Sequence, residues 1–254
     1  ISLLGGHRAD ANVLAERVAA AIGGQAVTTT AAEALGLPSV EALARQHGWT
    51  IENDGVAVTR LAAAIVNGEP IGALSQPHVG SWWPGPPEQI IAFETLEQLS
   101  EASVESALVI TDRVIPRPYA SNLDRWVFAR PGTLVAGMGC STGAPVAEIE
   151  SLLLSALEEA GMSHLSLAAL ATIDRRANEP ALQQLAVALA CPLRTFRAEE
   201  LASVAVPSPS AVVRAAVGTA SVCEAAALLA SGADHLLLTK RKNAVATVAL
   251  ARLP

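Results

Sequence analysis

Aromatic residues are scarce in this chain of 254 residues. Phenylalanine, tryptophan and tyrosine make up 3% of it, while 51% of its residues are hydrophobic. Such a composition disfavours an aromatic-rich all-β sandwich and favours helices that pack closely on a sheet. No apolar run reaches the roughly 18 uncharged residues of a membrane span, which excludes the membrane-spanning class.

Cysteine is also sparse, with three residues at Cys140, Cys191 and Cys223. The odd number argues against a disulfide framework, and the wide spacing matches no metal-ligand pattern. We therefore expect a cytoplasmic chain with free thiols and no metal held by the protein.

Lysine is nearly absent, and its two residues are clustered. Lys240 and Lys242 flank Arg241, and no acidic residue follows Asp234, so a chain with a formal net charge of −7 ends in a basic segment. The negative total disfavours nonspecific binding of nucleic acid. The basic segment has two interpretations: a solvated strand end, or a patch that pairs with carboxylates or phosphates.

Segments of strand and helix character alternate through the first part of the chain, which is typical of a parallel, doubly wound sheet. The predicted helices cover 11–22, 39–47 and 56–67, and the predicted strands cover 25–30, 49–51 and 70–74. The chain opens with I-S-L-L-G-G-H, without Met, which reads as the end of a strand. We therefore expect a start that lacks the first strands of its domain.

The amino-acid composition changes in the middle of the chain. Residues 75–88, S-Q-P-H-V-G-S-W-W-P-G-P-P-E, hold four of the fifteen prolines, which preclude regular structure there. A strand is predicted further on, over 107–111. The predicted fold class is α/β: two doubly wound, mostly parallel units, residues 1–75 and 133–254, joined by a smaller proline-rich middle region, residues 76–132.

The stretch from Thr133 to Glu150 organises the last part of the chain. It reads T-L-V-A-G-M-G-C-S-T-G-A-P-V-A-E-I-E, which predicts a strand over 134–136, a glycine loop over 137–143 and a helix opened by Pro145. The hydroxyls and backbone of the loop can face the free N–H groups of the first helical turn, so we expect an anion site there.

More elements are predicted downstream. The helices cover 146–160, 180–189, 211–217 and 222–230, and the strands cover 167–173, 193–196, 236–240 and 245–251. Ser221 and Glu224 have the spacing of a capping box at the start of the last helix.

Ligands of doubly wound sheets bind outside the carboxyl ends of the strands. Three segments lie there on this prediction: the 137–143 loop, Asp174-Arg175-Arg176, and Lys240 to Asn243. Together they offer backbone donors, one carboxylate and several cations. The sequence thus predicts a pocket for a polyanion.

The glycine loop has two other interpretations. Gly139-x-Ser141-x-Gly143 is the nucleophile-elbow pattern of α/β-hydrolases, and Asp174 and His235 follow in the order Ser, acid, His. The strands that this fold needs before the elbow are not predicted. The glycines also approach a dinucleotide fingerprint, but their spacing is one residue too long.

Short motifs along the whole chain match one known family. Ser2 to Asn12, S-L-L-G-G-H-R-A-D-A-N, resembles the signature S-L-L-S-G-H-x-G-G-A-N. Further matches follow in order: G-M-G-C (137–140), A-T-I-D (171–174), E-P (179–180), V-P-S-P-S (206–210), S-V-C-E-A-A-A-L (221–228) and K-R-K-N-A-V-A-T-V-A-L-A-R (240–252). The chain resembles the CbiG-type family, the cobalt-precorrin-5A hydrolases of the anaerobic cobalamin (vitamin B12) pathway. Ser141-Thr142 departs from the basic pair that is usual in the family.

The resemblance implies a reaction and a partner. The reaction is hydrolytic opening of the ring A lactone of cobalt-precorrin-5A, with loss of acetaldehyde, to give cobalt-precorrin-5B. The partner is this tetrapyrrole, which carries its own cobalt, so no cofactor is implied. Other enzymes of the pathway are candidate partners, and no nucleic acid or membrane is expected. The last domain alone resembles the stand-alone CobE protein, which leaves a non-catalytic tetrapyrrole carrier as the alternative.

Two residues are our hypothesis for the proton transfers, His7 and Asp174. For His7, a histidine that only closes its turn is the competing interpretation. The predicted substrate-binding residues are Gly6, Asn12, Gly137, Gly139, Cys140, Ser141, Thr142, Arg175, Glu179, Ser221, Glu224, Lys240 and Lys242.

Overall fold

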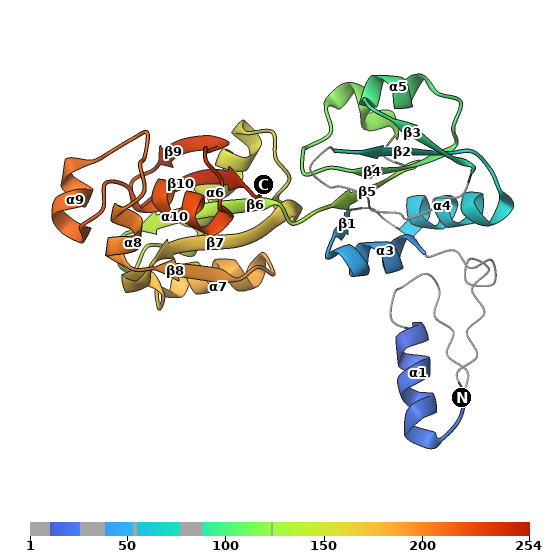
Figure 1. The fold of residues 1–254 in the computed structure, drawn as a ribbon, viewed down its shortest axis with the longest axis horizontal. Helices are drawn as coiled ribbons and strands as arrows, with labels where there is room; N and C mark the ends of the chain where they lie inside the picture. Colours follow the sequence, from blue (N-terminus) through green and yellow to red (C-terminus); the bar gives the residue numbers. More distant parts are fainter. Residues whose placement is uncertain (1–10, 26–38, 53–54, 77–87, 123) are drawn as a thin grey trace. The chain divides into compact units, whose positions relative to one another are not determined.

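The computed structural model describes residues 11–25, 39–52, 55–76, 88–122 and 124–254 (Figure 1). The chain divides into two compact units. Unit 1 runs to Thr111 and resumes over Ile115–Pro131, and unit 2 consists of Asp112–Val114 and Gly132–Pro254. Each unit has one sheet of mostly parallel strands with helices on it, which confirms the predicted fold class.

Unit 1 has a five-stranded sheet among its described residues, in the order β1-β5-β4-β2-β3. The strands β5, β4, β2 and β3 run parallel, and β1 is antiparallel to β5. The strands are β1 (Thr50–Glu52), β2 (Ile71–Ser75), β3 (Ile90–Phe93), β4 (Ser106–Ile110) and β5 (Trp126–Arg130). The helices are α1 (Ala11–Ile22), α3 (Val40–His47), α4 (Gly55–Asn67) and α5 (Leu96–Glu101), and Arg117–Asn122 forms a 3-10 turn.

The two faces of this sheet bury separate apolar clusters. Helices α3 and α4 pack with Leu108 and Ile110 on one face, and α5 packs with Val109 and Trp126 on the other. Alternate residues of β4 therefore face opposite clusters, as the strand period of two requires. The predicted helix over 39–47 is confirmed by α3.

The sheet of unit 1 crosses the boundary that we predict at residue 75. Strand β2, which precedes it, pairs in parallel with both β3 and β4, which follow it. Most of the described part of 76–132 thus belongs to the same unit as β2. The prediction instead made 76–132 a separate connecting region. Strands β3 (I-I-A-F) and β5 (W-V-F-A-R) are short and lack an alternating pattern, so periodicity does not reveal them.

Unit 2 has a sheet in the order β8-β7-β6-β10-β9. Strands β6, β7 and β8 run parallel, β10 is antiparallel to β6, and β9 is antiparallel to β10. The strands are β6 (Leu134–Cys140), β7 (Leu167–Ile173), β8 (Leu193–Phe196), β9 (Leu238–Lys242) and β10 (Ala246–Arg252). The helices are α6 (Val146–Glu159), α7 (Pro180–Ala188), α8 (Ala198–Ala202), α9 (Ala211–Val217) and α10 (Val222–Ser231), with 3-10 turns at His164–Ser166 and Asp174–Arg176.

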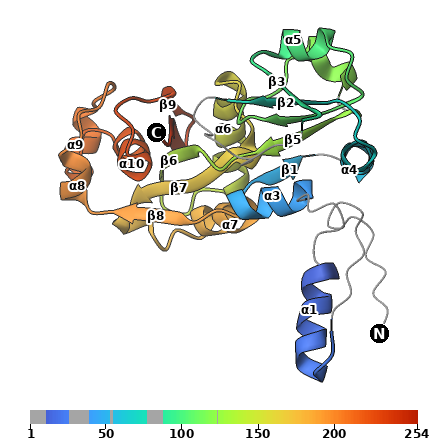
Figure 2. The ribbon, with the colours of Figure 1, turned by 45° about the vertical axis from the view of Figure 1, so that its right-hand side comes forward.

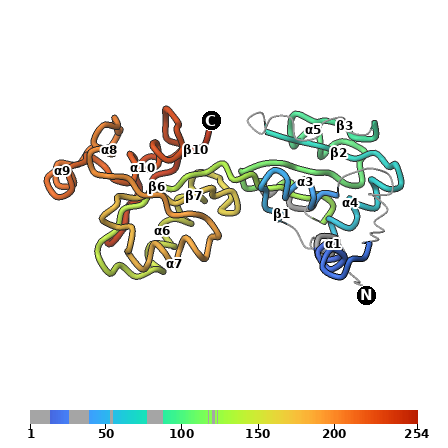
Figure 3. Tube along the Cα trace, turned by 60° about the horizontal axis from the view of Figure 1, so that its bottom comes forward, coloured from blue at the N-terminus to red at the C-terminus, as the bar shows by residue number. Residues whose placement is uncertain are grey.

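Helices cover both faces of the unit 2 sheet (Figure 3). Helices α6 and α7 lie on one face, where Leu134 and Met138 of β6 join the main apolar cluster. Helices α8 and α10 lie on the other face, where Val135 packs with Ala225 and Ala226. Figures 1 and 2 show α8 and α9 together at the end of the sheet where β8 finishes.

Gly137 and Gly139 lie inside β6, because the strand continues to Cys140. The prediction of a glycine loop over 137–143 is therefore wrong for its first half. A Cβ atom on Gly137 would lie 1.9 Å from the carbonyl oxygen of Cys223 and 2.6 Å from the amide nitrogen of Ala227. The glycine lets α10 rest directly on the strand backbone.

Asp112 anchors a short piece of chain in unit 2. Its fully buried carboxylate accepts two hydrogen bonds from the Arg252 guanidinium, at 2.8 and 3.0 Å, and one from the Thr133 hydroxyl at 2.7 Å. Its carbonyl accepts the N–H of Ser163 at 2.8 Å. The segment Asp112–Val114 is thereby tied to the last strand of the sheet.

Within the described ranges, no single helix has the length and apolar character of a membrane span. Helices α9 and α10 reach that composition only as a pair, and the chain bends by 75° between them.

Candidate functional site

The ends of β6, β7, β8 and β9 define one edge of the unit 2 sheet, which we call the carboxyl edge. Cys140 pairs with Ala246, and Thr247 pairs with Lys242. Since β10 is antiparallel to both of its neighbours, β9 finishes at the same end of the sheet as β6, with the start of β10 between them. The structure therefore brings together the three predicted segments, at the ends of β6, β7 and β9.

The loop from Ser141 to Pro145 connects β6 to α6. The Ser141 N–H donates to the Val245 carbonyl at 2.9 Å, which ties the loop to the β9–β10 turn, and the Ala144 N–H donates to the Ser141 carbonyl at 3.3 Å. The N-cap of α6 is Pro145, which makes no side-chain hydrogen bond. Ser141 and Thr142 are exposed and do not cap the helix, contrary to the sequence prediction.

Glu179 reaches this loop from the start of α7. Its side chain is 5% exposed, and Oε1 accepts the Gly143 N–H at 3.0 Å. Arg176 Nη1 lies 3.4 Å from Glu179 Oε2 and donates to Thr142 Oγ1 at 2.6 Å. A carboxylate of the protein itself thus holds the N–H group that we expected to be open to an external anion.

The exposed charges of the carboxyl edge are few. Asp174 and Arg175 follow β7, and the Asp174 carboxylate accepts the Arg175 N–H at 2.7 Å. Lys242 ends β9 and is also exposed. In the described part of the chain, the Arg175 and Lys242 side chains have no hydrogen-bonded or ionic partner. Arg241 differs, because its guanidinium pairs with both carboxylate oxygens of Glu159.

Glu224 and Lys240 are engaged inside the protein. Glu224 is fully buried, and its two oxygens accept the N–H groups of Ser208 at 3.1 Å and Lys240 at 3.0 Å. Lys240 Nζ donates to the Ser208 carbonyl at 2.7 Å. The predicted capping box is wrong, because the Ser221 side chain makes no cap bond and Glu224 bonds to distant segments instead. These contacts tie α10 and β9 to the segment that precedes α9.

Cys140 ends β6 beside Glu179 and Arg176. Burial raises the pKa of its thiol, the Glu179 charge raises it further, and the Arg176 charge opposes both. A thiol with a raised pKa stays protonated near neutral pH and is a poor nucleophile. The half-buried Cys140 therefore fits a packing role at the end of the strand.

Comparison with known proteins shows similarity along the whole chain. Three family models match in order: "Cobalamin synthesis G N-terminal" at residues 1–33, "Cobalamin biosynthesis central region" at 38–131 and "Cobalamin synthesis G C-terminus" at 134–251. The cobalt-precorrin-5A hydrolase of Priestia megaterium is 34% identical over 100% of this chain and 68% of its own length. The chain belongs to the CbiG family.

A second relative agrees with this membership. The cobalt-precorrin-5A hydrolase of Salmonella typhimurium (strain LT2) is 31% identical over 96% of this chain and 69% of its own length. The crystal structure of CobE, a protein from the cobalamin biosynthetic pathway, is 39% identical over 47% of this chain and 93% of the CobE chain, with a TM-score of 0.45.

The structure describes only part of the CbiG family signature at the start of the chain. Gly6 and His7 lie outside the described residues, and Asn12 lies in α1. The predicted roles of His7 and Asp174 in proton transfer therefore stay predictions. Within the described ranges, no group of three His, Cys, Asp or Glu residues could hold a metal ion.

The nucleophile-elbow alternative fails on geometry for this CbiG family member. Leu238 pairs with Leu250, which pairs with Ala136, so the start of β9 lies about 16 Å from Ser141 along the sheet, at roughly 3.3 Å per residue. His235 precedes β9 and lies at the edge opposite to Ser141. The two cannot share a proton. The dinucleotide alternative also loses its loop, since Gly139 lies in β6.

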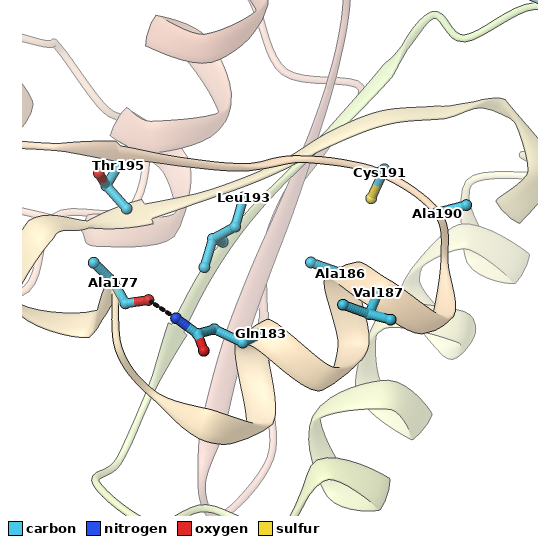
Figure 4. A pocket seen from close by; sticks show the side chains of 8 residues that line it. All are labelled: Ala177, Gln183, Ala186, Val187, Ala190, Cys191, Leu193 and Thr195. Carbon is cyan, nitrogen blue, oxygen red and sulfur yellow. Dashed lines mark hydrogen bonds between the residues drawn. The ribbon is translucent and has the colours of Figure 1, made fainter.

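A groove of about 590 Å³ lies between α7 and β8, on the side of the sheet that α6 and α7 cover (Figure 4). Gln183 Nε2 donates to the Ala177 carbonyl at 2.9 Å on its wall. No lining side chain carries a charge, so the groove does not suit an acid-rimmed ligand. The lining residues are Ala177, Gln183, Ala186, Val187, Ala190, Cys191, Leu193 and Thr195.

Asn243, predicted only as the end of the segment from Lys240, shapes the β9–β10 turn of this CbiG family member. Its Oδ1 accepts the N–H groups of Val245 at 3.0 Å and Ala246 at 2.8 Å, and its Nδ2 donates to the Glu148 carbonyl at 2.9 Å. An asparagine between two predicted strands is the signal that could have revealed it.

Proposed function

We propose that this chain is a hydrolase of cobalamin biosynthesis that acts on cobalt-precorrin-5A. The observation that carries the proposal is the match to two cobalt-precorrin-5A hydrolases, at 34% and 31% identity, over essentially the whole chain. All three family segments occur in order, so the similarity is not confined to one unit.

The reaction that we propose is opening of the ring A lactone with loss of acetaldehyde, to give cobalt-precorrin-5B. Lactone hydrolysis consumes one water, breaks the acyl–oxygen bond and leaves a carboxylate and a hydroxyl group. Acetaldehyde is released when the hydroxyl loses its proton and the carbon–carbon bond from its carbon to the macrocycle breaks, with the bonding electron pair left on the macrocycle. The hydrolysis needs a base that activates the water and a group that supports the developing negative charge. The cobalt enters with the macrocycle, so these steps call for protein side chains and not for a resident cofactor.

Arg175 and Lys242 are the residues that we propose for binding the acid arms of the substrate. Both are exposed at the carboxyl edge, and neither charge is neutralised within the described part of the chain. A guanidinium can hold a carboxylate through two parallel hydrogen bonds, and an ammonium adds a mobile point charge. A macrocycle rimmed with acetate and propionate arms suits such a pair.

Asp174 and His7 remain our proposal for the proton transfers. Asp174 follows β7 directly and is exposed, so its carboxylate is open to water and to a ligand at the carboxyl edge. An imidazole such as that of His7 can gain or lose a proton near neutral pH.

The direct test is turnover of cobalt-precorrin-5A, with released acetaldehyde and the mass of the corrinoid measured in one reaction. We expect one acetaldehyde for each substrate consumed. Asp174→Asn and His7→Ala should each lower kcat by about 100-fold or more, the usual size of a general acid–base contribution. Asp234→Asn, an exposed carboxylate before β9, is the matched control and should keep wild-type kcat. Absence of acetaldehyde with the wild-type protein would refute the proposal.

A non-catalytic tetrapyrrole carrier is the second candidate. It is favoured by the similarity to the protein CobE of Sinorhizobium sp., which is 36% identical over 46% of this chain and 79% of its own length. Absorbance titration with cobalt-precorrin-5A, run beside the acetaldehyde assay, separates the two. A carrier would change the corrinoid spectrum and release no acetaldehyde.

A further inference from the structure

Glu179 serves two helices at once. Its carbonyl accepts the N–H groups of Leu182 at 3.1 Å and Gln183 at 3.2 Å, which starts α7. Its carboxylate crosses to the loop before α6 and accepts the Gly143 N–H at 3.0 Å. One nearly buried acidic residue therefore stands where negative charge is stabilised by the start of the 14-residue helix α6.

Arg176 completes this arrangement. It lies 3.4 Å from the Glu179 carboxylate and holds the Thr142 hydroxyl at 2.6 Å, with 28% of its own side chain exposed. A loop N–H, a cation and a helix start are the components of an anion site. Here the anion that they hold is Glu179 itself.

A second carboxylate would meet repulsion at this position. Two like charges within about 4–6 Å disfavour each other's ionised form, and the effect is strong where water is excluded. Burial is the main cause of the raised pKa of the neighbouring Cys140 thiol; the Glu179 charge raises this pKa further and the Arg176 charge opposes it. The exposed Arg175 and Lys242 offer unneutralised charge on the same edge of the sheet.

We propose that Glu179 is a specificity-determining residue: as a built-in anion it closes the β6–α6 loop to acid arms and leaves Arg175 and Lys242 to receive them. The acid arms in this inference are those of the macrocycle in the proposed function, on which it rests. The occupation of the loop by Glu179 is independent of that function.

The test is a sodium formate titration of the full chain without substrate, followed by the amide signal of Gly143 in a nitrogen–proton correlation spectrum. In the wild-type protein we expect no saturable shift. In Glu179→Ala, formate should enter the vacated position between Gly143 and Arg176. Formate should then shift the Gly143 signal of the variant along a saturation curve. Its dissociation constant should be at least about tenfold below the highest formate concentration that leaves the wild-type signal unsaturated, and formate should raise the thermal midpoint of the variant.

Glu159→Ala is the matched control, because it also removes one negative charge but lies at the end of α6 beside Arg241. It should behave like the wild-type protein. An unresponsive Gly143 signal in folded Glu179→Ala, or an equal response in the wild-type protein, would overturn the proposal.

Glu179→Gln covers the case in which the alanine variant does not fold. The amide keeps the shape and an acceptor for Gly143 but removes the charge, so its formate affinity should exceed that of the wild-type protein. Equal affinities would show that the charge of Glu179 does not exclude anions, which overturns the proposal. Since the titration contains no corrinoid, its failure leaves the hydrolase proposal intact. Failure of the acetaldehyde assay likewise leaves the titration result intact.

Discussion

At the scale of single residues, Gly137 is the most tightly packed of the glycines on the unit 2 sheet. A methyl group there would overlap the carbonyl of Cys223, and the backbone of α10 cannot turn aside as a flexible side chain could. Gly132, by contrast, has its nearest neighbour at 3.8 Å from an added Cβ, an ordinary contact.

We expect Gly137→Ala to lower the free energy of unfolding by upwards of about 3 kcal/mol, at the severe end of overpacking. Gly132→Ala should change it little. Urea unfolding of both variants checks this. Equal stability of the two would mean that α10 shifts away from β6 without cost.

The buried thiols give the protein a dependence on alkaline pH. Burial, the main cause, raises the pKa of Cys223 above its ordinary value of 9.0. The unfolded chain therefore loses this proton first, and the stability that the thiol contributes is complete below about pH 9 and is lost as the pH rises further. Thermal midpoints between pH 7 and 10.5, roughly one unit or more on either side of a free thiol's pKa, should fall less steeply in Cys223→Ala than in the wild-type protein. Parallel slopes would contradict the assignment.

At the scale of elements, Glu224 connects three segments: α10, β9 and the chain before α9. Both of its oxygens accept backbone N–H groups, so neither position tolerates a donor. Glu224→Gln places an amide N–H against one of them. We expect a loss of about 2 kcal/mol in the free energy of unfolding, the usual size for a buried donor left without a partner.

Amide hydrogen exchange locates that effect. The N–H groups of Ser208 and Lys240 should exchange faster in Glu224→Gln, while those of α6 keep their protection. Glu158→Gln, an exposed glutamate on α6, is the control and should leave both amides unchanged. Unchanged exchange in Glu224→Gln would show that other contacts hold these segments.

Two regular elements of unit 2 were predictable because polar or turn residues bound their apolar runs. The strand over 167–173 is confirmed to the residue by β7, and the helix over 211–217 by α9. The end of β6 was not predictable. Glycines in a sequence suggest a turn, whereas Gly137 lies in a strand and leaves room for the backbone of α10. The sequence alone does not show that α10 packs there.

The site was predictable at the level of segments and less so at the level of side chains. The alternation of strands and helices predicts that ligand-binding segments follow the strands, and the three predicted segments do lie at the same end of the sheet. Which charges stay open depends on partners distant in sequence. Arg241 finds Glu159, 82 positions away, whereas Lys242 finds no partner within the described residues.

At the scale of the whole molecule, the chain passes between the two units more than once. It leaves unit 1 at Asp112, returns at Ile115 and leaves again at Gly132. The ion pair of Asp112 with Arg252 holds the first of the two segments that belong to unit 2. The Asp112 side chain is fully buried and the Arg252 side chain is 21% exposed.

Asp112→Asn should destabilise unit 2 by about 2–4 kcal/mol, because it leaves a largely buried guanidinium without its counter-ion. Amide exchange in β10 should quicken, while exchange in β4 of unit 1 stays as in the wild-type protein. Glu52→Gln removes the more exposed partner of Arg130 in unit 1 and serves as the converse control. Equal effects of Asp112→Asn on both units would argue against a local role.

The three residues Asp112–Val114 set a limit on dissection. A gene cut between codons 131 and 132 leaves Asp112-Arg113-Val114 on the first product. In the second product Arg252, at the end of β10, loses the Asp112 carboxylate that pairs with it. A single cut in the chain therefore cannot separate the two units. An isolated C-terminal piece should be supplied with residues 112–114, either as a peptide or grafted onto the piece.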